Sequence, residues 1–80
     1  MNPAATDIRI IPVRVHDAFE VVGVDGTFSL SVYSMAGVLQ TQLEQMTANQ
    51  MVNATALQTG VYIVVVNGDN THFTQRIIKE

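Results

Sequence analysis

Cysteine is absent from the sequence, so a disulfide framework, a thiolate metal site and a cysteine nucleophile are all excluded. Basic residues are also few: the chain contains only Arg9, Arg14, Arg76 and Lys79. Because these residues are scattered and the formal net charge is −3, neither a nucleic-acid interface nor attraction to an anionic lipid surface is expected.

Long apolar runs are missing as well. No stretch of about 18 apolar residues occurs, so no transmembrane helix is predicted. The opening residues, MNPAATD, have neither a basic segment nor an apolar segment, so they do not form a secretory signal peptide. Charged residues make up only 14% of the chain, so Thr, Gln, Asn and Ser must supply much of the surface.

What the chain does have is enough apolar sequence for one small core. Hydrophobic residues are 48% of the 80 residues, which is typical of a single globular domain. In residues 27–34, Phe28, Leu30 and Val32 alternate with polar side chains, as in a half-buried antiparallel strand. Residues 38–46 alternate in the same way. A helical alternative for 38–56 is open, but the β-rich flanks favour strands.

The stretch from Gly60 to Val66, GVYIVVV, is apolar at every position after the glycine. This pattern is typical of a strand that lies at the centre of its sheet or is buried on both faces. Residues 67–70 then predict a turn into a last strand over 71–79. Because side chains alternate along a strand, we expect Ile77 to face the core together with Phe73. Lys79, as a charged residue, is expected to be exposed.

Turn and edge signals complete the pattern. Asp25–Gly26 predicts a tight hairpin turn, and further turns are expected at 34–37 and 47–50. Residues 8–15 alternate with a change of phase at Ile10–Ile11, and Pro12 cannot donate to a neighbouring strand, so we expect an edge strand with a bulge. The edges at 8–15 and 71–79 carry few charges, which predicts a weak homodimer through an edge strand.

These elements predict an all-β fold: a small antiparallel immunoglobulin-like β-sandwich of about six to seven strands, forming a single domain over residues 1–80. The search for chemistry within it finds little. His16–Asp17 is the one adjacent histidine–carboxylate pair and is interpreted as part of a solvated turn, since no serine lies in a nucleophile elbow. His16 and His72 have no metal-ligand spacing. We expect no catalysis, no metal and no cofactor. Tyr62 is expected to pack in the core with its hydroxyl on a backbone partner.

Four segments, in order, carry a resemblance to a known family. They are NPAATDIRI at 2–10, SLSVYSMAGVLQTQ at 29–42, ATALQTGVYIVVV at 54–66 and FTQRIIKE at 73–80. Together they resemble the type A C-terminal sorting domain of the type IX secretion system of Bacteroidetes. The chain departs from the family pattern in places: Ser34 stands where an aspartate is usual, Val38 where a basic residue is usual, and Arg76 where a lysine is usual. Glu80 follows the terminal lysine.

The resemblance implies a function. In that family the domain is a folded signal on a larger cargo, read in the periplasm by an outer-membrane translocon. A sortase-like peptidase then removes it and the cargo is often attached to the cell surface. The chain is therefore expected to be excised from a larger exported protein. The matching motif positions are Gly37, Leu39, Leu57, Gly60, Tyr62, Val64, Arg76, Ile77, Ile78 and Lys79.

A second hypothesis is an immunoglobulin- or fibronectin-like binding module of a surface adhesin or a carbohydrate-active enzyme. The two hypotheses differ in position along the polypeptide. A binding module carries its site on loops and can lie in the middle of a chain, whereas a sorting signal must end the polypeptide.

Overall fold

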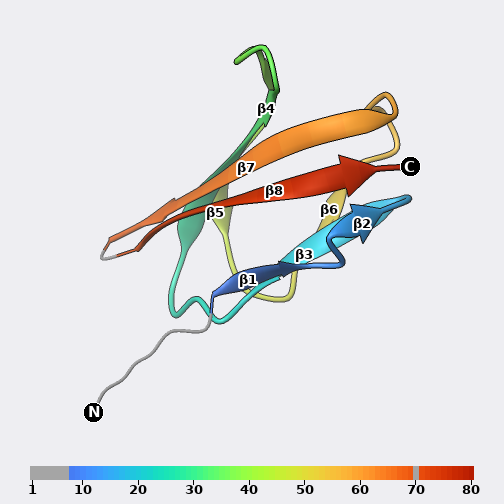
Figure 1. The fold of residues 1–80 in the computed structure, drawn as a ribbon. Coiled ribbons are helices and arrows are strands. Elements are labelled where there is room, and N and C mark those ends of the chain that lie inside the picture. The colour runs from blue at the N-terminus through green and yellow to red at the C-terminus, as the bar shows by residue number, and fades with distance from the viewer. Residues whose placement is uncertain (1–7, 70) are drawn as a thin grey trace.

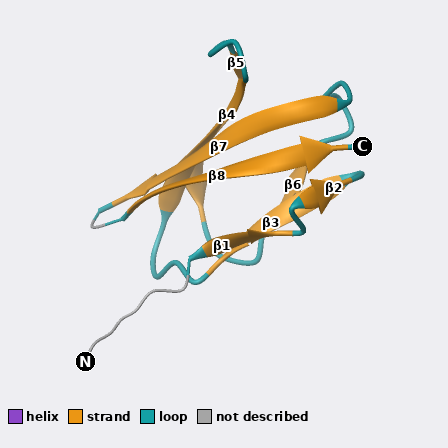
Figure 2. Ribbon diagram, in the orientation of Figure 1, coloured by secondary structure: helices purple, strands orange, loops and turns teal. Residues whose placement is uncertain are grey.

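The computed structural model describes residues 8–69 and 71–80, and all regular structure in them is β-strand (Figure 2). The strands are β1 (Arg9–Ile11), β2 (Arg14–Val15), β3 (Ala18–Val22), β4 (Phe28–Ser34), β5 (Leu39–Met46), β6 (Met51–Asn53), β7 (Gly60–Gly68) and β8 (His72–Lys79). The helical alternative for 38–56 is therefore wrong. None of the described residues forms a helix that is long and apolar enough to cross a bilayer.

The strands form two facing sheets (Figure 1). One has three strands in the order β1-β3-β6, and the other has five in the order β2-β8-β7-β4-β5. All neighbours are antiparallel except β2 and β8, which run parallel. The predicted sandwich is confirmed, and β7 lies at the centre of the five-stranded sheet as its apolar sequence predicts.

The first predicted strand is divided between the sheets. β1 pairs with β3 in the smaller sheet, and after the cis peptide bond Ile11–Pro12 the chain crosses to the larger sheet, where β2 pairs with β8. The single bulged strand expected over 8–15 is therefore wrong, but the expected edge position is confirmed, because β1 and β2 each lie at the edge of a sheet. Pro12 lies between two short strands, where its missing N–H disturbs neither ladder. This division raises the number of strands in the described residues to eight.

The predicted hairpin at Asp25–Gly26 is also wrong, because β3 and β4 belong to different sheets. The positive φ angles lie at Gly23 (+89°) and Gly26 (+77°), and Asp25 has none. Between these glycines Val24 is buried in the core. The segment is thus a loop that crosses from one sheet to the other and inserts an apolar side chain on the way, which a two-residue turn cannot do.

The core lies between the two sheets and is formed by the inward positions of the alternating strands. β4 contributes Phe28, Leu30 and Val32, each at most 3% exposed. The other buried apolar residues are Ile10, Val15, Phe19, Val21, Val24, Val52, Ala54, Tyr62, Val64, Val66 and Ile77. β5 is different, because none of its eight residues is fully buried.

Candidate functional site

The terminal strand β8 and its neighbour β7 bring most of the motif residues together. In their antiparallel register Gly60 lies opposite Lys79, and Tyr62 lies opposite Ile77. β4 and β5 lie beyond β7 in the same sheet and carry Leu39 on β5. One continuous sheet therefore holds segments that are far apart in the sequence (Figure 1).

Four of the motif residues are structural, because they build the core. Tyr62, Val64 and Ile77 are 7%, 0% and 0% exposed, and Leu57, in the loop after β6, is partly buried against the core. Ile77 shares the inward face of β8 with Phe73, as predicted. The Tyr62 hydroxyl donates a hydrogen bond to the carbonyl oxygen of Gln58 at 2.7 Å, which confirms the expected backbone partner.

Two motif glycines allow the backbone to adopt positive φ angles. Gly37 has a φ of +85° in the turn between β4 and β5, a conformation that favours glycine. In the same turn the Gly37 N–H donates to the Ser34 carbonyl at 2.9 Å, and the Val38 N–H donates to Ser34 Oγ at 3.2 Å. The serine that replaces the usual aspartate thus still supplies a side-chain oxygen to the turn. Gly60, with a φ of +156°, begins β7.

The remaining motif residues lie nearer the surface. Arg76 is exposed and Ile78 is half-buried, and both point away from the core. Across the sheet, Arg76 lies opposite Ile63, Ile63 opposite Tyr33, and Tyr33 opposite Leu39. This row joins Leu39 and Arg76, 37 positions apart in the sequence, on the outer face of the five-stranded sheet.

The prediction that Lys79 is exposed is wrong. The side chain is half-buried, because the alternation that turns Ile77 inward also places Lys79 on the inward side at the end of β8. Its Nζ donates to the carbonyl oxygen of Glu80 at 3.2 Å. The aliphatic stem of Lys79 therefore lies along the end of the sandwich, with the ammonium group at its margin.

Glu80 ties the last residues to β2. Its carboxylate contacts Arg14 Nε at 3.0 Å and His16 Nε2 at 3.3 Å. The backbone adds two hydrogen bonds, from Ile78 N–H to the Val13 carbonyl and from Glu80 N–H to the Val15 carbonyl, both at 2.9 Å. Sequence reasoning assigned His16 to a solvated turn beside Asp17 and did not identify Glu80 as its neighbour.

The edges proposed from the sequence for pairing are partly closed. β2 covers the end of β8 at Ile78 and Lys79. Gln75, on the inward face of β8, hydrogen-bonds both backbone groups of Ile10 on β1. Sequence reasoning missed this contact. Its one signal was a polar amide between Phe73 and Ile77 on a face that is otherwise apolar.

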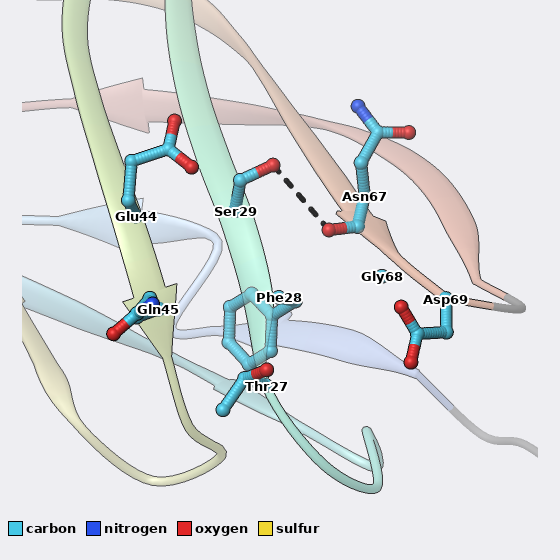
Figure 3. A pocket seen from close by; sticks show the side chains of 8 residues that line it. All are labelled: Thr27, Phe28, Ser29, Glu44, Gln45, Asn67, Gly68 and Asp69. Atoms are coloured by element: carbon cyan, nitrogen blue, oxygen red, sulfur yellow. Dashed lines mark hydrogen bonds between the residues drawn. The ribbon is translucent and has the colours of Figure 1, made fainter.

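A polar hollow lies where β4 begins (Figure 3). Its volume is about 310 Å³, and it is lined by Thr27, Phe28, Ser29, Glu44, Gln45, Asn67, Gly68 and Asp69. Ser29 Oγ donates to the Asn67 carbonyl at 3.3 Å. Within residues 8–69 and 71–80, no three His, Asp or Glu side chains gather in a way that could hold a metal ion.

The two histidines stay apart. His72, at the start of β8, has its Nδ1 against Asn67 Oδ1, whereas His16 lies beside Glu80 after the other end of that strand. They cannot share a ligand.

Comparison with known proteins gives a family and a fold. A family model described as "Secretion system C-terminal sorting domain" matches residues 2–80. Among solved structures the chain is similar to PorZ, an essential bacterial surface component of the type-IX secretion system of Porphyromonas gingivalis. The TM-score is 0.70 at 20% identity, over 92% of this chain and 11% of that one. This likeness shows the fold, and the chain spans about a ninth of the length of that protein. No curated protein matches the sequence significantly.

Proposed function

The chain belongs to the family of secretion system C-terminal sorting domains, the sorting signals of type IX secretion, and from this premise we propose how it acts. It is a folded sorting signal at the C-terminus of a larger exported protein. Sorting by type IX secretion delivers the cargo to the cell surface or to the medium. We further propose that the sorting signal acts in the periplasm, that it is not itself an enzyme, and that a sortase-like peptidase later removes it while the cargo is attached to the surface.

The observation that carries this proposal is the match of the family model to residues 2–80. The arrangement of the motif residues supports it. Leu57, Tyr62, Val64 and Ile77 hold the domain together, while Leu39, Arg76, Ile78 and Lys79 reach the surface or its margin. A sorting signal that is recognised in the folded state needs a core that fixes its shape and surface side chains that a receptor can contact.

We propose that the translocon reads the end of β8. Arg76 and Ile78 lie on its outer face, and the Lys79 ammonium lies at the margin of the sandwich. β7 on one side and β2 on the other hold this segment in an extended conformation before any partner binds. Such preorganisation lowers the entropic cost of recognition. We also propose, as a separate property, that the isolated domain self-associates weakly through an edge strand.

The test of sorting is a transplant. Residues 1–80 are fused to the C-terminus of a periplasmic reporter in a bacterium with type IX secretion, and the ratio of surface and medium reporter to periplasmic reporter is measured. We expect export, and we expect none in a translocon mutant. A matched fusion with the domain at the N-terminus of the reporter should stay inside.

A folded, intact terminal fusion that remains periplasmic would contradict the proposal. Equal export of both fusions would contradict the requirement for a terminal position. It would favour a binding module that is exported together with the reporter without acting as the signal.

A further inference from the structure

One peptide bond in the chain joins an asparagine to a glycine, Asn67–Gly68. The other asparagines are followed in order by proline, glutamine, alanine and threonine: Asn2, Asn49, Asn53 and Asn70. Asparagine is chemically labile, because the next backbone nitrogen can attack its side-chain carbonyl carbon. A glycine in the next position has no Cβ to obstruct that attack. Asn67 is therefore the asparagine whose neighbour favours the reaction most.

The reaction needs only water. The Gly68 nitrogen bonds to Asn67 Cγ, and its proton leaves with the side-chain NH₂ group as ammonia, which closes a succinimide ring. Water then opens the ring at either carbonyl. One opening gives aspartate. The other gives isoaspartate, in which the main chain runs through the side-chain carbon and is longer by one methylene.

The folded structure holds this pair in a conformation that disfavours ring closure. The sequence predicts a turn over 67–70, but β7 continues through Gly68, so both residues lie in a strand. Asn67 pairs with His72 on one side and with Ser29 on the other. In an extended backbone the next nitrogen points away from the side-chain carbon that it must reach. Asn67 is exposed, so its strand conformation protects it and burial does not.

Hydrogen bonds fix the same pair. The Gly68 N–H donates to the Thr71 carbonyl at 2.9 Å, so the attacking nitrogen is itself engaged. Ser29 Oγ donates to the Asn67 carbonyl at 3.3 Å (Figure 3). His72 Nδ1 lies against Asn67 Oδ1. Ring closure requires the Gly68 N–H to leave its partner and the Asn67 side chain to turn away from His72. The hairpin of β7 and β8 must therefore open first.

Gly68 is needed for packing. A Cβ at this position would lie 3.3 Å from the Thr27 carbonyl oxygen and 3.6 Å from Phe28 Cβ. Glycine within a strand often marks such a close approach of another backbone. The fold therefore favours the one neighbour that makes Asn67 reactive, and the same fold keeps the pair from reacting.

We propose that Asn67 is a site of spontaneous deamidation that is closed in the folded domain and opens when the β7–β8 hairpin separates. Isoaspartate lengthens the main chain just before Gly68 and displaces this glycine from Phe28 and Thr71, with which it pairs. A chain that stays unfolded therefore loses the ability to rebuild this end of the hairpin. The inference does not depend on export.

Mass spectrometry of the chain, folded in buffer and unfolded in guanidinium chloride at the same pH and temperature, measures the rate. The conversion of an amide into a carboxyl group changes the mass, and fragment masses assign the residue. We expect modification of Asn67 to be at least ~10-fold faster in the unfolded protein, since a reaction that needs opening follows the small open population. Asn67→Gln is the matched control, because its longer side chain would have to close a larger ring, and it should remove most of the mass change. Equal rates in the folded and unfolded protein would overturn the proposal, and so would modification of the unfolded protein mainly at another asparagine.

A second measurement tests the consequence for folding. The isoaspartyl and aspartyl products are separated by chromatography, and Asn67→Asp supplies the aspartyl product directly. Asn67→Asp changes the charge but keeps the length of the main chain, so it should refold. The isoaspartyl chain should melt at a lower temperature than Asn67→Asp. If the two melt alike, the added methylene does not disturb the end of the hairpin and the proposed consequence is wrong.

Discussion

Gln75 on β8 does for Ile10 what a neighbouring strand would do, although 65 positions separate the two residues. The Ile10 N–H donates to Gln75 Oε1 at 3.1 Å, and Gln75 Nε2 donates to the Ile10 carbonyl at 3.0 Å. β1 is an edge strand that already pairs with β3 on its other side. The Gln75 side-chain amide thus provides hydrogen-bond partners for both backbone groups of Ile10 on the outer edge of β1. It also joins the two sheets where β1 and β8 approach each other.

Gln75→Met keeps the length of this side chain and removes both hydrogen bonds. We expect a loss of about 1–3 kcal/mol in the free energy of unfolding, because two partly buried backbone groups lose their partner. For a domain of this size each kcal/mol lowers Tm by roughly 4–8 °C. A thermal melt measures the effect. Thr74→Val, on the exposed face of the same strand, is the control and should change little. A Gln75→Met protein as stable as wild type would show that water replaces the amide.

Local alternation in the sequence was enough to predict most strands. The inward face of β4, the central place of β7 and the burial of Ile77 all follow from it. The predictions that failed concern how one sheet is placed relative to the other. The crossing at Pro12, the loop through buried Val24 and the contact of Gln75 with Ile10 each depend on partners far away in the sequence. No window of neighbouring residues contains that information.

The surface of the candidate site was predicted less well than its core. Tyr62 and Ile77 are buried as expected because apolar side chains of this size leave water when a core is available. Lys79 was assigned to the surface from its charge, but its position two residues after Ile77 places its stem on the inward side. For the last residue of a strand, the phase of the alternation was a better guide than polarity.

Tyr62→Phe removes only the hydroxyl that donates to Gln58 at 2.7 Å. We expect a loss of about 0.5–1.5 kcal/mol, since the ring keeps its place in the core and one hydrogen bond is lost. The expected export of the fused reporter is unchanged, because Tyr62 is 7% exposed and cannot be read directly. Chemical denaturation measures the stability. A folded Tyr62→Phe domain that fails to export would contradict a purely structural role.

Ile77 and Ile78 form a matched pair of adjacent isoleucines on opposite faces of β8. Ile77→Ala should cost about 2–4 kcal/mol, because it leaves a cavity where the side chain is 0% exposed. Ile78→Ala should cost less, since that side chain is half-buried on the outer face. The comparison of two thermal melts checks this order. We expect Ile77→Ala to lose export by unfolding. If Ile78→Ala is the more destabilising change, the alternation described for β8 is wrong.

The last two residues allow folding and recognition to be separated. Removing both would delete the hydrogen bond from Glu80 N–H to the Val15 carbonyl and the pairing of Val15 with Lys79. We expect that deletion to lower Tm by several degrees, as for the loss of a backbone hydrogen bond worth about 0.5–1.5 kcal/mol. A loss of export after the deletion would therefore not reveal what is read.

Two single substitutions resolve this ambiguity. Lys79→Met keeps the half-buried stem and removes the charge, and Glu80→Gln weakens the contacts with Arg14 and His16 while the backbone bond stays. Both should stay within about 0.5 kcal/mol of wild type, since exposed charges and ion pairs contribute little to stability. We expect Lys79→Met to fold normally and to be exported poorly. Glu80→Gln should both fold and be exported like the wild type. Melts of the isolated domain and the export ratio of the fused reporter are measured on the same variants. Full export of Lys79→Met would show that the ammonium group is dispensable, and the extended backbone of β8 with its outer-face side chains would then be what the machinery recognises.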